Sequence, residues 1–209
     1  MLILLLAAVA APSAVDAERA FARDARRNGQ WTASRAYAGP DAVMFTPQAI
    51  WARDFHKGRR DPRQSVRWSP NASYVSCDGR IAVNTGPWQS PDGRQHGFYT
   101  TVWELHGGRW RWISDGRHTM AKPLAARATP IVRTASCSGH ASGPPLMPTP
   151  SAKPGPGGAS PDDFGRGISA DRTLGWDWRV GPNGSRRFRT FLWNGRSYVL
   201  AVEQTIGAR

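Results

Sequence analysis

Asp115 and His118 are the two side chains of this sequence whose types and positions best suit proton transfer. They lie near the end of the aromatic segment from Trp110 to His118, which is rich in residues that favour strands. A carboxyl group among apolar side chains has a raised pKa and can then act as an acid or a base near neutral pH. The plainer interpretation, that Asp115 caps a turn or pairs with an arginine, is favoured, because perturbed groups do not always mark catalysis.

Alternation along two expected strands predicts which side chains share a pocket with these groups. Successive side chains of a strand point to opposite faces, so Trp112 and His118 share one face and Asp115 lies on the other. A β-bulge, which is an extra residue in one strand, would turn Asp115 onto the face of Trp112. The side chains expected to line the pocket are Tyr99, Thr101, Trp103, Trp112 and Ser114.

Four consecutive strands must position these side chains. The expected strands are Ser73 to Cys77, Ile81 to Trp88, His96 to Leu105 and Trp110 to His118. The turn signals between them are Asp78-Gly79, Pro91-Asp92-Gly93 and Gly107-Gly108. Glycine supplies the positive φ angles that tight hairpin turns need. An antiparallel sheet is therefore expected over residues 73–118.

Helices are expected before these strands. Apolar residues recur at helical spacing over residues 18–38 and are interrupted by Asn28-Gly29, which predicts two short helices. A short strand over Asp41 to Phe45 and a helix over Ala49 to Lys57 follow. Helices gathered at one end of the chain are the available cover for the apolar face of a sheet. The predicted fold class is α+β, with a curved antiparallel sheet covered by N-terminal helices.

In the order of its elements, the chain resembles the nuclear transport factor 2-like superfamily over residues 18–118. The segments that carry the resemblance are Glu18-Arg19-Ala20-Phe21-Ala22, Pro40-Asp41-Ala42-Val43-Met44-Phe45, Lys57-Gly58-Arg59 and Gly108-Arg109-Trp110-Arg111-Trp112-Ile113. The superfamily includes SnoaL-like and ketosteroid-isomerase-like proteins. The resemblance implies a strongly bent, cone-shaped sheet with an apolar pocket, in which related enzymes use a buried carboxylate or histidine to move protons. Many relatives have a histidine directly after the acid that corresponds to Asp115, where this chain has Gly116.

The chain is strongly basic, with 28 Lys and Arg, 15 Asp and Glu, and a formal net charge of +13. Such a charge favours anionic partners. It is spread along the chain, however, and an exported protein meets little nucleic acid, so no nucleic-acid partner is expected. The expected partner is a small apolar or acidic molecule. Peripheral contact with an anionic envelope surface and a homodimer stay open, and the plainer interpretation is a generally basic protein.

The first residues resemble an export signal. Leu2 to Ala11 is an uncharged apolar run, and Val15-Asp16-Ala17 resembles a signal-peptidase site before Glu18. A membrane anchor would need about 20 apolar residues. No Lys or Arg precedes the run, which is the one feature that fits an export signal badly. We expect residues 1–17 to be a cleaved signal peptide of a periplasmic or secreted protein.

Composition divides the remainder of the chain. Seven Pro and five Gly fall within the 24 residues from Ser138 to Pro161, which is typical of an exposed linker. The three strands expected after it, as a β meander, are Leu174 to Val180, Arg186 to Trp193 and Ser197 to Gln204. Three strands barely form a domain, so the meander must pack on the cone, on itself or on a partner. The expected domains are the cone over residues 18–120, an extension and linker over 121–161, and the meander over 162–209.

Cys77 and Cys137 are the only cysteines. In an oxidising compartment, an even number of cysteines favours a disulfide, and the alternative is a pair of free, buried thiols. The five histidines show no metal-ligand spacing, and the cysteines are too far apart for a local zinc site. Neither a metal nor another cofactor is expected.

Two classes of function remain open. The first is an exported protein that binds a small molecule in an apolar cone, extending to acid–base catalysis of the isomerase, cyclase or dehydratase kind. The second is a structural or interaction module of the cell envelope whose cone is filled by its own side chains. We prefer the first because the fold tends to keep its pocket. A cavity with a polar group at its base would distinguish the two.

Overall fold

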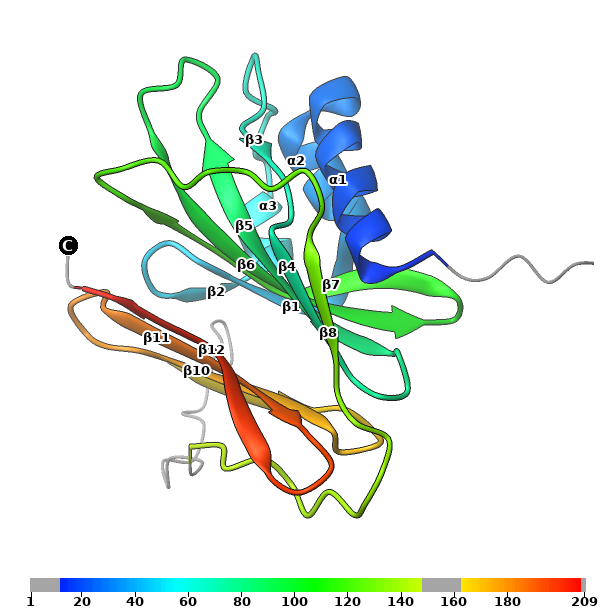
Figure 1. Cartoon of the computed structure of the whole chain (residues 1–209). Coiled ribbons are helices and arrows are strands. Elements are labelled where there is room, and N and C mark those ends of the chain that lie inside the picture. Colours follow the sequence, from blue (N-terminus) through cyan, green and yellow to red (C-terminus); the bar gives the residue numbers. More distant parts are fainter. Residues whose placement is uncertain (1–11, 148–162, 208–209) are drawn as a thin grey trace, which may run out of the picture.

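A computed structural model describes residues 12–147 and 163–207 as three layers (Figure 1). Helices α1, Ala14–Asn28, and α2, Gln30–Tyr37, cover one face of a large curved sheet. A smaller sheet, formed by the C-terminal strands, packs on the other face. The α+β class is as predicted, and the meander packs on the back of the large sheet.

The large sheet has eight strands and is not closed. Its strands are β1 Ala38–Phe45, β2 Ala49–Trp51, β3 Arg67–Trp68, β4 Ala72–Val75, β5 Ile81–Gln89, β6 His96–His106, β7 Arg109–Thr119 and β8 Ile131–Thr134. They follow the order β2-β1-β7-β6-β5-β4-β8, and β3 pairs with β5. The antiparallel sheet predicted over residues 73–118 is correct for β4–β5, β5–β6 and β6–β7, but β1 lies parallel to β7 and β8 parallel to β4. Each parallel pair is joined by a long connection, as parallel pairing requires.

Helix α1 begins with a capping box. The Ser13 side chain accepts a hydrogen bond from the backbone N–H of Asp16, and the Asp16 carboxylate accepts one from the backbone N–H of Ser13. The helix breaks from α2 at Gly29, whose φ of +103° is readily adopted only by glycine. This break is the one predicted at Asn28-Gly29. The helix starts at Ala14, so the predicted cleavage site after Ala17 falls inside its first turn.

The helix predicted over Ala49 to Lys57 is wrong in its first half. Ala49–Trp51 forms strand β2, which pairs antiparallel with the end of β1, and only Ala52–His56 forms a helix, α3. The local pattern favours a helix, but pairing with β1 satisfies the backbone groups of these three residues. Tertiary context overrides local propensity here.

The C-terminal sheet has four strands rather than the three predicted. They are β9 Phe164–Ile168, β10 Leu174–Val180, β11 Arg186–Trp193 and β12 Tyr198–Ile206, in the order β12-β11-β10-β9. Strand β9 contains Gly165 and Gly167, which lowers its apparent strand propensity. A Cβ atom at Gly165 would lie 2.4 Å from the Trp178 ring, and one at Gly167 would lie 2.2 Å from the Trp176 ring. Because these glycines have no side chain, the rings of Trp176 and Trp178 can pack directly against the backbone of β9.

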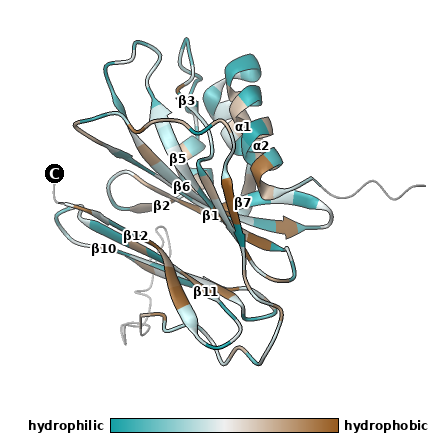
Figure 2. Cartoon of the chain, in the orientation of Figure 1, coloured by the Kyte–Doolittle hydropathy of each residue, from teal (hydrophilic) through white to brown (hydrophobic). Residues whose placement is uncertain are grey.

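Two apolar cores hold the three layers together. The first lies between the helices and the large sheet, where Phe21 and Ala25 of α1 meet Trp103 and Trp112. The second lies between the sheets, where Val83 and Val102 meet the C-terminal strands. The hydropathy colours in Figure 2 follow this division, with hydrophilic residues along the outward side of α1. Both faces of the large sheet are thus covered.

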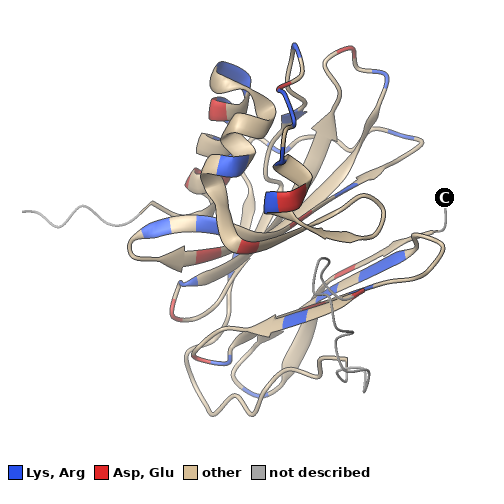
Figure 3. Ribbon diagram, turned by 180° about the vertical axis from the view of Figure 1, so that it is seen from behind, with Lys and Arg blue, Asp and Glu red and all other residues tan. Residues whose placement is uncertain are grey.

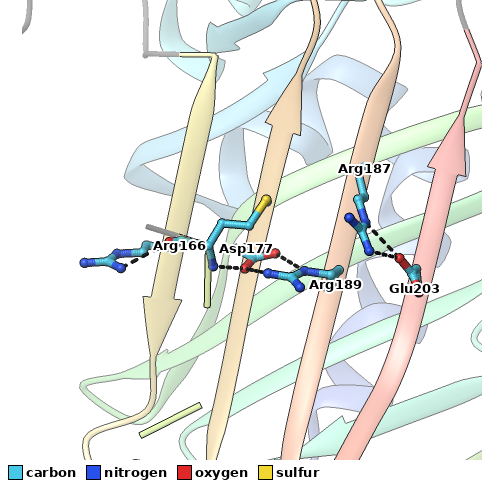
Figure 4. A network of polar contacts seen from close by, with 6 residues as sticks. Arg166, Asp177, Arg187, Arg189 and Glu203 are labelled. Atoms are coloured by element: carbon cyan, nitrogen blue, oxygen red, sulfur yellow. Dashed lines mark hydrogen bonds and ion pairs between the residues drawn. The ribbon is translucent and has the colours of Figure 1, made fainter. Parts of the chain in front are cut away.

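A polar network crosses the outer face of the C-terminal sheet (Figure 4). The Asp177 carboxylate is fully buried and accepts hydrogen bonds from the Arg189 guanidinium and from the backbone N–H of Met147 at 2.7 Å. A more exposed pair joins Arg187 of β11 to Glu203 of β12. The segment that ends at Met147 is therefore fixed to this sheet. Most of the predicted linker, residues 148–161, lies outside the described residues, as does the apolar run Leu2 to Ala11.

Within residues 12–147 and 163–207, no helix is long and apolar enough to cross a membrane.

Candidate functional site

We call the space between the helices and the facing side of the large sheet the cone, and Glu18 lies there fully buried between α1 and the sheet. Its carboxylate accepts hydrogen bonds from the indole N–H groups of Trp68 and Trp103, each at 2.7 Å between Nε1 and the carboxylate oxygen. The side-chain amide of Asn84 donates a third hydrogen bond at 3.3 Å. Burial raises the pKa of Glu18 to about 7, although these three donors oppose the rise.

A β-bulge in β7 decides which of the predicted side chains face the cone. The register of β6 and β7 shifts between Val102 and Trp103, because Ile113 is an extra residue in β7. Beyond the bulge, Asp115 pairs with Thr101 and lies on the cone face with Trp112. This is the bulge that the sequence analysis named as the condition for Asp115 to face inward.

The same bulge corrects the predicted faces of Ser114 and His118. Ser114 pairs with Val102, which packs in the core between the sheets, and His118 pairs with Phe98 on the same side. Their side chains therefore point toward the C-terminal sheet and not into the cone. The His118 ring lies 5.4 Å from the Phe98 ring. Of the two predicted proton-transfer groups, only Asp115 faces the cone.

Asp115 is buried beside a polar cluster. Thr101 Oγ1 donates a hydrogen bond to Asp115 Oδ1 at 2.8 Å. Burial raises the pKa of Asp115, while the positive charge of Arg117, the hydrogen bond from Thr101 and the charge of Arg186 lower it. The predicted neighbours Tyr99, Thr101, Trp103 and Trp112 all lie on this face.

Like the Oδ1 atom of Asn84, the Tyr99 hydroxyl has no hydrogen-bond partner among the described residues. It is buried, and no hydrogen bond to it is formed by residues 12–147 or 163–207. Burial raises the pKa of Tyr99 well above its ordinary value, and the nearby carboxylates of Glu18 and Asp115 raise it further. An unpaired hydroxyl at this depth marks a place for water or a ligand.

A small cavity lies against this cluster. Its volume is about 20 Å³, measured as the space that the centre of a water-sized sphere can occupy. A water needs about 10–15 Å³ by this measure, so the cavity holds one or two waters. Trp103 and Trp112 are fully buried and fill much of the cone around it. The lining residues that matter here are Gln30, Trp31, Tyr99, Asp115 and Arg117.

Gly116 connects the cluster to the C-terminal sheet. Arg186 of β11 is buried against the back of the large sheet, with its Cζ atom 4.2 Å from the centre of the Phe45 ring. A Cβ atom at Gly116 would lie 2.8 Å from Arg186 Nη2. Gly116 thus leaves room for a guanidinium one residue from Asp115.

Replacing Gly116 with alanine is therefore expected to destabilise the protein by about 1–3 kcal/mol, because overpacking displaces a buried side chain. In an Arg186→Ala background the same change should destabilise the protein less, by at least about 1 kcal/mol. Interaction energies of this order are typical of residues in contact. Urea denaturation of the four proteins of this cycle measures the difference. Equal costs in both backgrounds would contradict the close packing of Arg186 on Gly116.

Cys77 and Cys137, the predicted pair, are joined by a disulfide in the structure. Cys77 follows β4, and Cys137 follows β8 just before the segment that leads to the C-terminal sheet. The bridge therefore lies where the edge of the large sheet meets the second sheet. Among the described residues, no three His, Cys, Asp or Glu side chains are grouped as metal ligands.

Glu18 is one of the members of the site that the sequence analysis did not identify. Its apolar neighbours on α1, Ala14, Phe21 and Ala25, recur at helical spacing and face the sheet. Glu18 occupies a position of the same stripe. An acid within an apolar stripe is the signal that could have revealed it.

Comparisons with known proteins give structural neighbours only. No family model matches the chain, and no curated protein matches it. A protein of unknown function from the DUF3225 family of Pectobacterium atrosepticum is 14% identical, with a TM-score of 0.38, over 49% of this chain and 87% of its own. A candidate calcium/calmodulin-dependent kinase II association domain from Exiguobacterium sibiricum is 15% identical, with a TM-score of 0.38, over 53% of this chain and 97% of its own.

A third neighbour is a candidate aromatic ring hydroxylase from Novosphingobium aromaticivorans. It is 14% identical, with a TM-score of 0.37, over 54% of this chain and 89% of its own. Similarities this low identify neither a family nor an activity.

Proposed function

We propose that this chain binds a small molecule inside the cone, against Tyr99 and Asp115. The expected ligand is small and flat, with one hydrogen-bonding group that reaches the Tyr99 hydroxyl. The curved sheet, its helical cover and the inward-facing carboxylates agree with the proposed resemblance to nuclear transport factor 2-like proteins, including the SnoaL-like group. That resemblance remains part of the proposal.

The unpaired Tyr99 hydroxyl is the observation that carries the proposal. Leaving a buried polar group without a hydrogen bond costs about 1–3 kcal/mol. A ligand that pairs with this hydroxyl would recover part of that free energy. Asp115 lines the same cavity as Tyr99, and the negative charges of Glu18 and Asp115 raise the pKa of Tyr99. Buried titratable groups gathered at a cavity are typical of binding and catalytic sites.

Binding of anything larger than water requires the cavity to widen. Trp31 forms part of its wall and is only partly buried, in contrast to Trp103 and Trp112. Rotation of the Trp31 side chain would open the cavity without disturbing the fully buried tryptophans. Trp31 is therefore the side chain expected to move.

Ligand-observed NMR with phenol, benzyl alcohol, benzamide and benzoate tests the proposal. We expect at least one probe to bind, and Tyr99→Phe to weaken it about threefold to tenfold, the effect of one hydrogen bond. Tyr198→Phe is the matched control, because the Tyr198 hydroxyl donates to the Arg172 carbonyl in the C-terminal sheet. Binding that Tyr99→Phe leaves unchanged would place the ligand elsewhere and overturn the proposal.

The second candidate is a non-catalytic envelope module with a filled cone. The small volume of the cavity and the complete burial of Trp103 and Trp112 favour it. In that case none of the four probes binds, and a water molecule pairs with Tyr99. The same NMR experiment thus separates the two candidates.

If the ligand is a substrate, we propose that Asp115 transfers the proton. Glu18 is the second carboxyl group of the site that could do so. Both carboxyl groups have raised pKa values in a water-poor setting, which suits an acid or a base near neutral pH. His118 is not proposed for this role, because it lies on the opposite face of the sheet.

Export to the periplasm or the medium is also proposed, supported by the apolar run and the disulfide. Cleavage after Ala17 would remove Ser13, the N-cap of α1, and the Ala14 carbonyl, which accepts a hydrogen bond from Asn84. Pro12 would also be lost, and its carbonyl accepts a hydrogen bond from Trp110. We therefore expect N-terminal sequencing of envelope-fraction protein to give a start at or before Pro12. An intact Met1 in the cytosol would contradict export.

A further inference from the structure

A basic groove of about 720 Å³ lies beside the cone, on the side of α2 and α3. It is formed by the end of α2, the start of β1, helix α3 and the loop that follows α3. Figure 3 shows Lys and Arg positions gathered on α3 and this loop. The charged residues that line the groove are Arg35, Arg53, Lys57 and Arg59, and no acid lines it.

Three acids lie near the groove, and none of them lines it. Asp61 accepts hydrogen bonds from the backbone N–H groups of Trp31 and Thr32 and from the Thr32 hydroxyl, so it caps α2. Asp41 pairs with Arg53 at 3.3 Å. Asp54 lies in the first turn of α3, with its side chain exposed and outside the groove lining. The groove therefore keeps a net positive charge.

Of the four cations of the groove, Arg53 pairs with Asp41, two others are held in place by the chain and one is not. Arg35 donates hydrogen bonds to the carbonyls of His56 and Arg59, which fixes the loop to α2. The Arg59 guanidinium lies over the Phe55 ring at 4.0 Å, and its Nε donates to the Phe55 carbonyl. Lys57 is exposed and has no ion-pair partner within the described part of the chain. Lys57 and Arg59 can therefore meet an incoming anion.

Trp31 separates this groove from the cavity. The Arg59 Cζ atom lies 5.5 Å from the centre of the Trp31 ring, and the Arg117 Cζ atom lies 6.0 Å from it. Arg59 belongs to the groove and Arg117 to the cavity wall. If Trp31 moves aside, a molecule between groove and cavity would meet one guanidinium on each side.

We propose that the ligand of the cone is a flat molecule with one negative charge, which enters from the groove beside Trp31 and keeps its charge between Arg59 and Arg117. The charge cannot go deeper, because Glu18 and Asp115 repel an anion there. The neutral end of the ligand then reaches the Tyr99 hydroxyl. The basic groove also raises the association rate of anions by electrostatic steering. This inference rests on the proposed cone site and specifies the charge of its ligand.

Benzoate and benzamide, which have nearly the same shape but differ in charge, test the inference at pH 7.5. We expect benzoate to bind at least tenfold more tightly than benzamide at low salt, and this preference to shrink at 0.5 M NaCl because salt screens exposed charges. Arg59→Gln should reduce the preference to about threefold or less, and Lys57→Gln should reduce the benzoate association rate. Arg187→Gln, on the far sheet, removes the same charge and should leave the preference unchanged.

The outcomes separate this inference from the proposed function. If both probes bind equally and Arg59→Gln has no effect, the cone site stands and the anionic ligand is wrong. If 4-hydroxybenzoate, whose neutral phenol group can reach the Tyr99 hydroxyl, binds and Tyr99→Phe does not weaken it, the anion occupies the groove alone and the inference is also wrong. If neither probe binds while phenol or benzyl alcohol does, the cone site stands and the anionic ligand is wrong. If none of the four probes binds, both proposals fail.

Discussion

Replacing both Cys77 and Cys137 with serine is expected to lower the free energy of unfolding by about 4 kcal/mol. The two cysteines are 60 residues apart. In the chain-entropy model, a crosslink of that span removes about this much free energy of loop closure from the unfolded chain. Since a typical domain is stable by about 5–15 kcal/mol, the bridge would account for a large share of its stability.

The position of the bridge makes a further loss expected when it is broken. Next to it, the backbone N–H of Cys77 donates to the Thr173 hydroxyl at 2.8 Å, and that of Asp78 donates to the Asp171 carboxylate at 2.7 Å. Both acceptors lie in the turn between β9 and β10. The disulfide therefore stabilises a junction that also joins the two sheets through hydrogen bonds.

Urea denaturation of the native protein, the reduced protein and the double serine variant measures this contribution. A reductant should destabilise the native protein and leave the double variant unchanged, which controls for effects of the reductant itself. Two reactive thiols in unreduced, denatured protein, or a loss of stability below about 1 kcal/mol, would contradict the expectation, because the model gives a much larger loss for this span.

Local signals in the sequence predicted the central hairpins well. The turns at Asp78-Gly79 and Gly107-Gly108 need glycine at positive φ, and the structure has Gly79 at +68° and Gly108 at +76°. These signals act within a few residues. Strand β8, in contrast, pairs in parallel with β4 across about 60 residues and has all its side chains exposed. Nothing local in such a strand shows which partner it will find.

The site was predicted only in part for a related reason. Alternation assigns faces correctly until an extra residue enters the strand, and one bulge at Ile113 exchanges the faces of Asp115 and His118. The sequence allowed a bulge but did not locate it. Arg117 and Arg186 were missed because their importance depends on pairing and on packing between sheets.

The pH dependence of stability is expected to reveal Glu18. Its pKa rises from 4.5 in the unfolded chain to about 7 in the folded protein. Between these values the folded protein binds more protons than the unfolded chain, so the stability contributed by this group is full below pH 4.5 and is lost as the pH rises through 7. A pKa difference of this size corresponds to about 3 kcal/mol.

His56 has the opposite effect over nearly the same range. Burial, together with the charges of Arg35 and Arg59, lowers the pKa of His56 from 6.5 to about 4. The unfolded chain then binds the extra proton, so stability falls as the pH drops from 6.5 toward 4. Between pH 4.5 and 6.5 the contributions of Glu18 and His56 largely cancel, and Asp115, whose pKa is also raised, adds to that of Glu18. The native protein alone would therefore not separate the contribution of Glu18 from that of His56.

Single variants separate the two contributions. Relative to the native protein, Glu18→Gln should shift the slope of stability against pH upward between pH 4.5 and 6.5, and His56→Gln should shift it downward, as measured by urea denaturation at four pH values from 4.5 to 7.5. The stability difference between the native protein and Glu18→Gln should shrink by about 3 kcal/mol from pH 4.5 to above pH 7. Glu18→Gln also loses stability at every pH, since an amide N–H then faces an indole N–H, but that loss is constant. Glu203→Gln, at an exposed ion pair with Arg187, is the matched control. Parallel curves for the native protein and Glu18→Gln would mean that the three N–H donors keep the Glu18 pKa near its ordinary value despite burial.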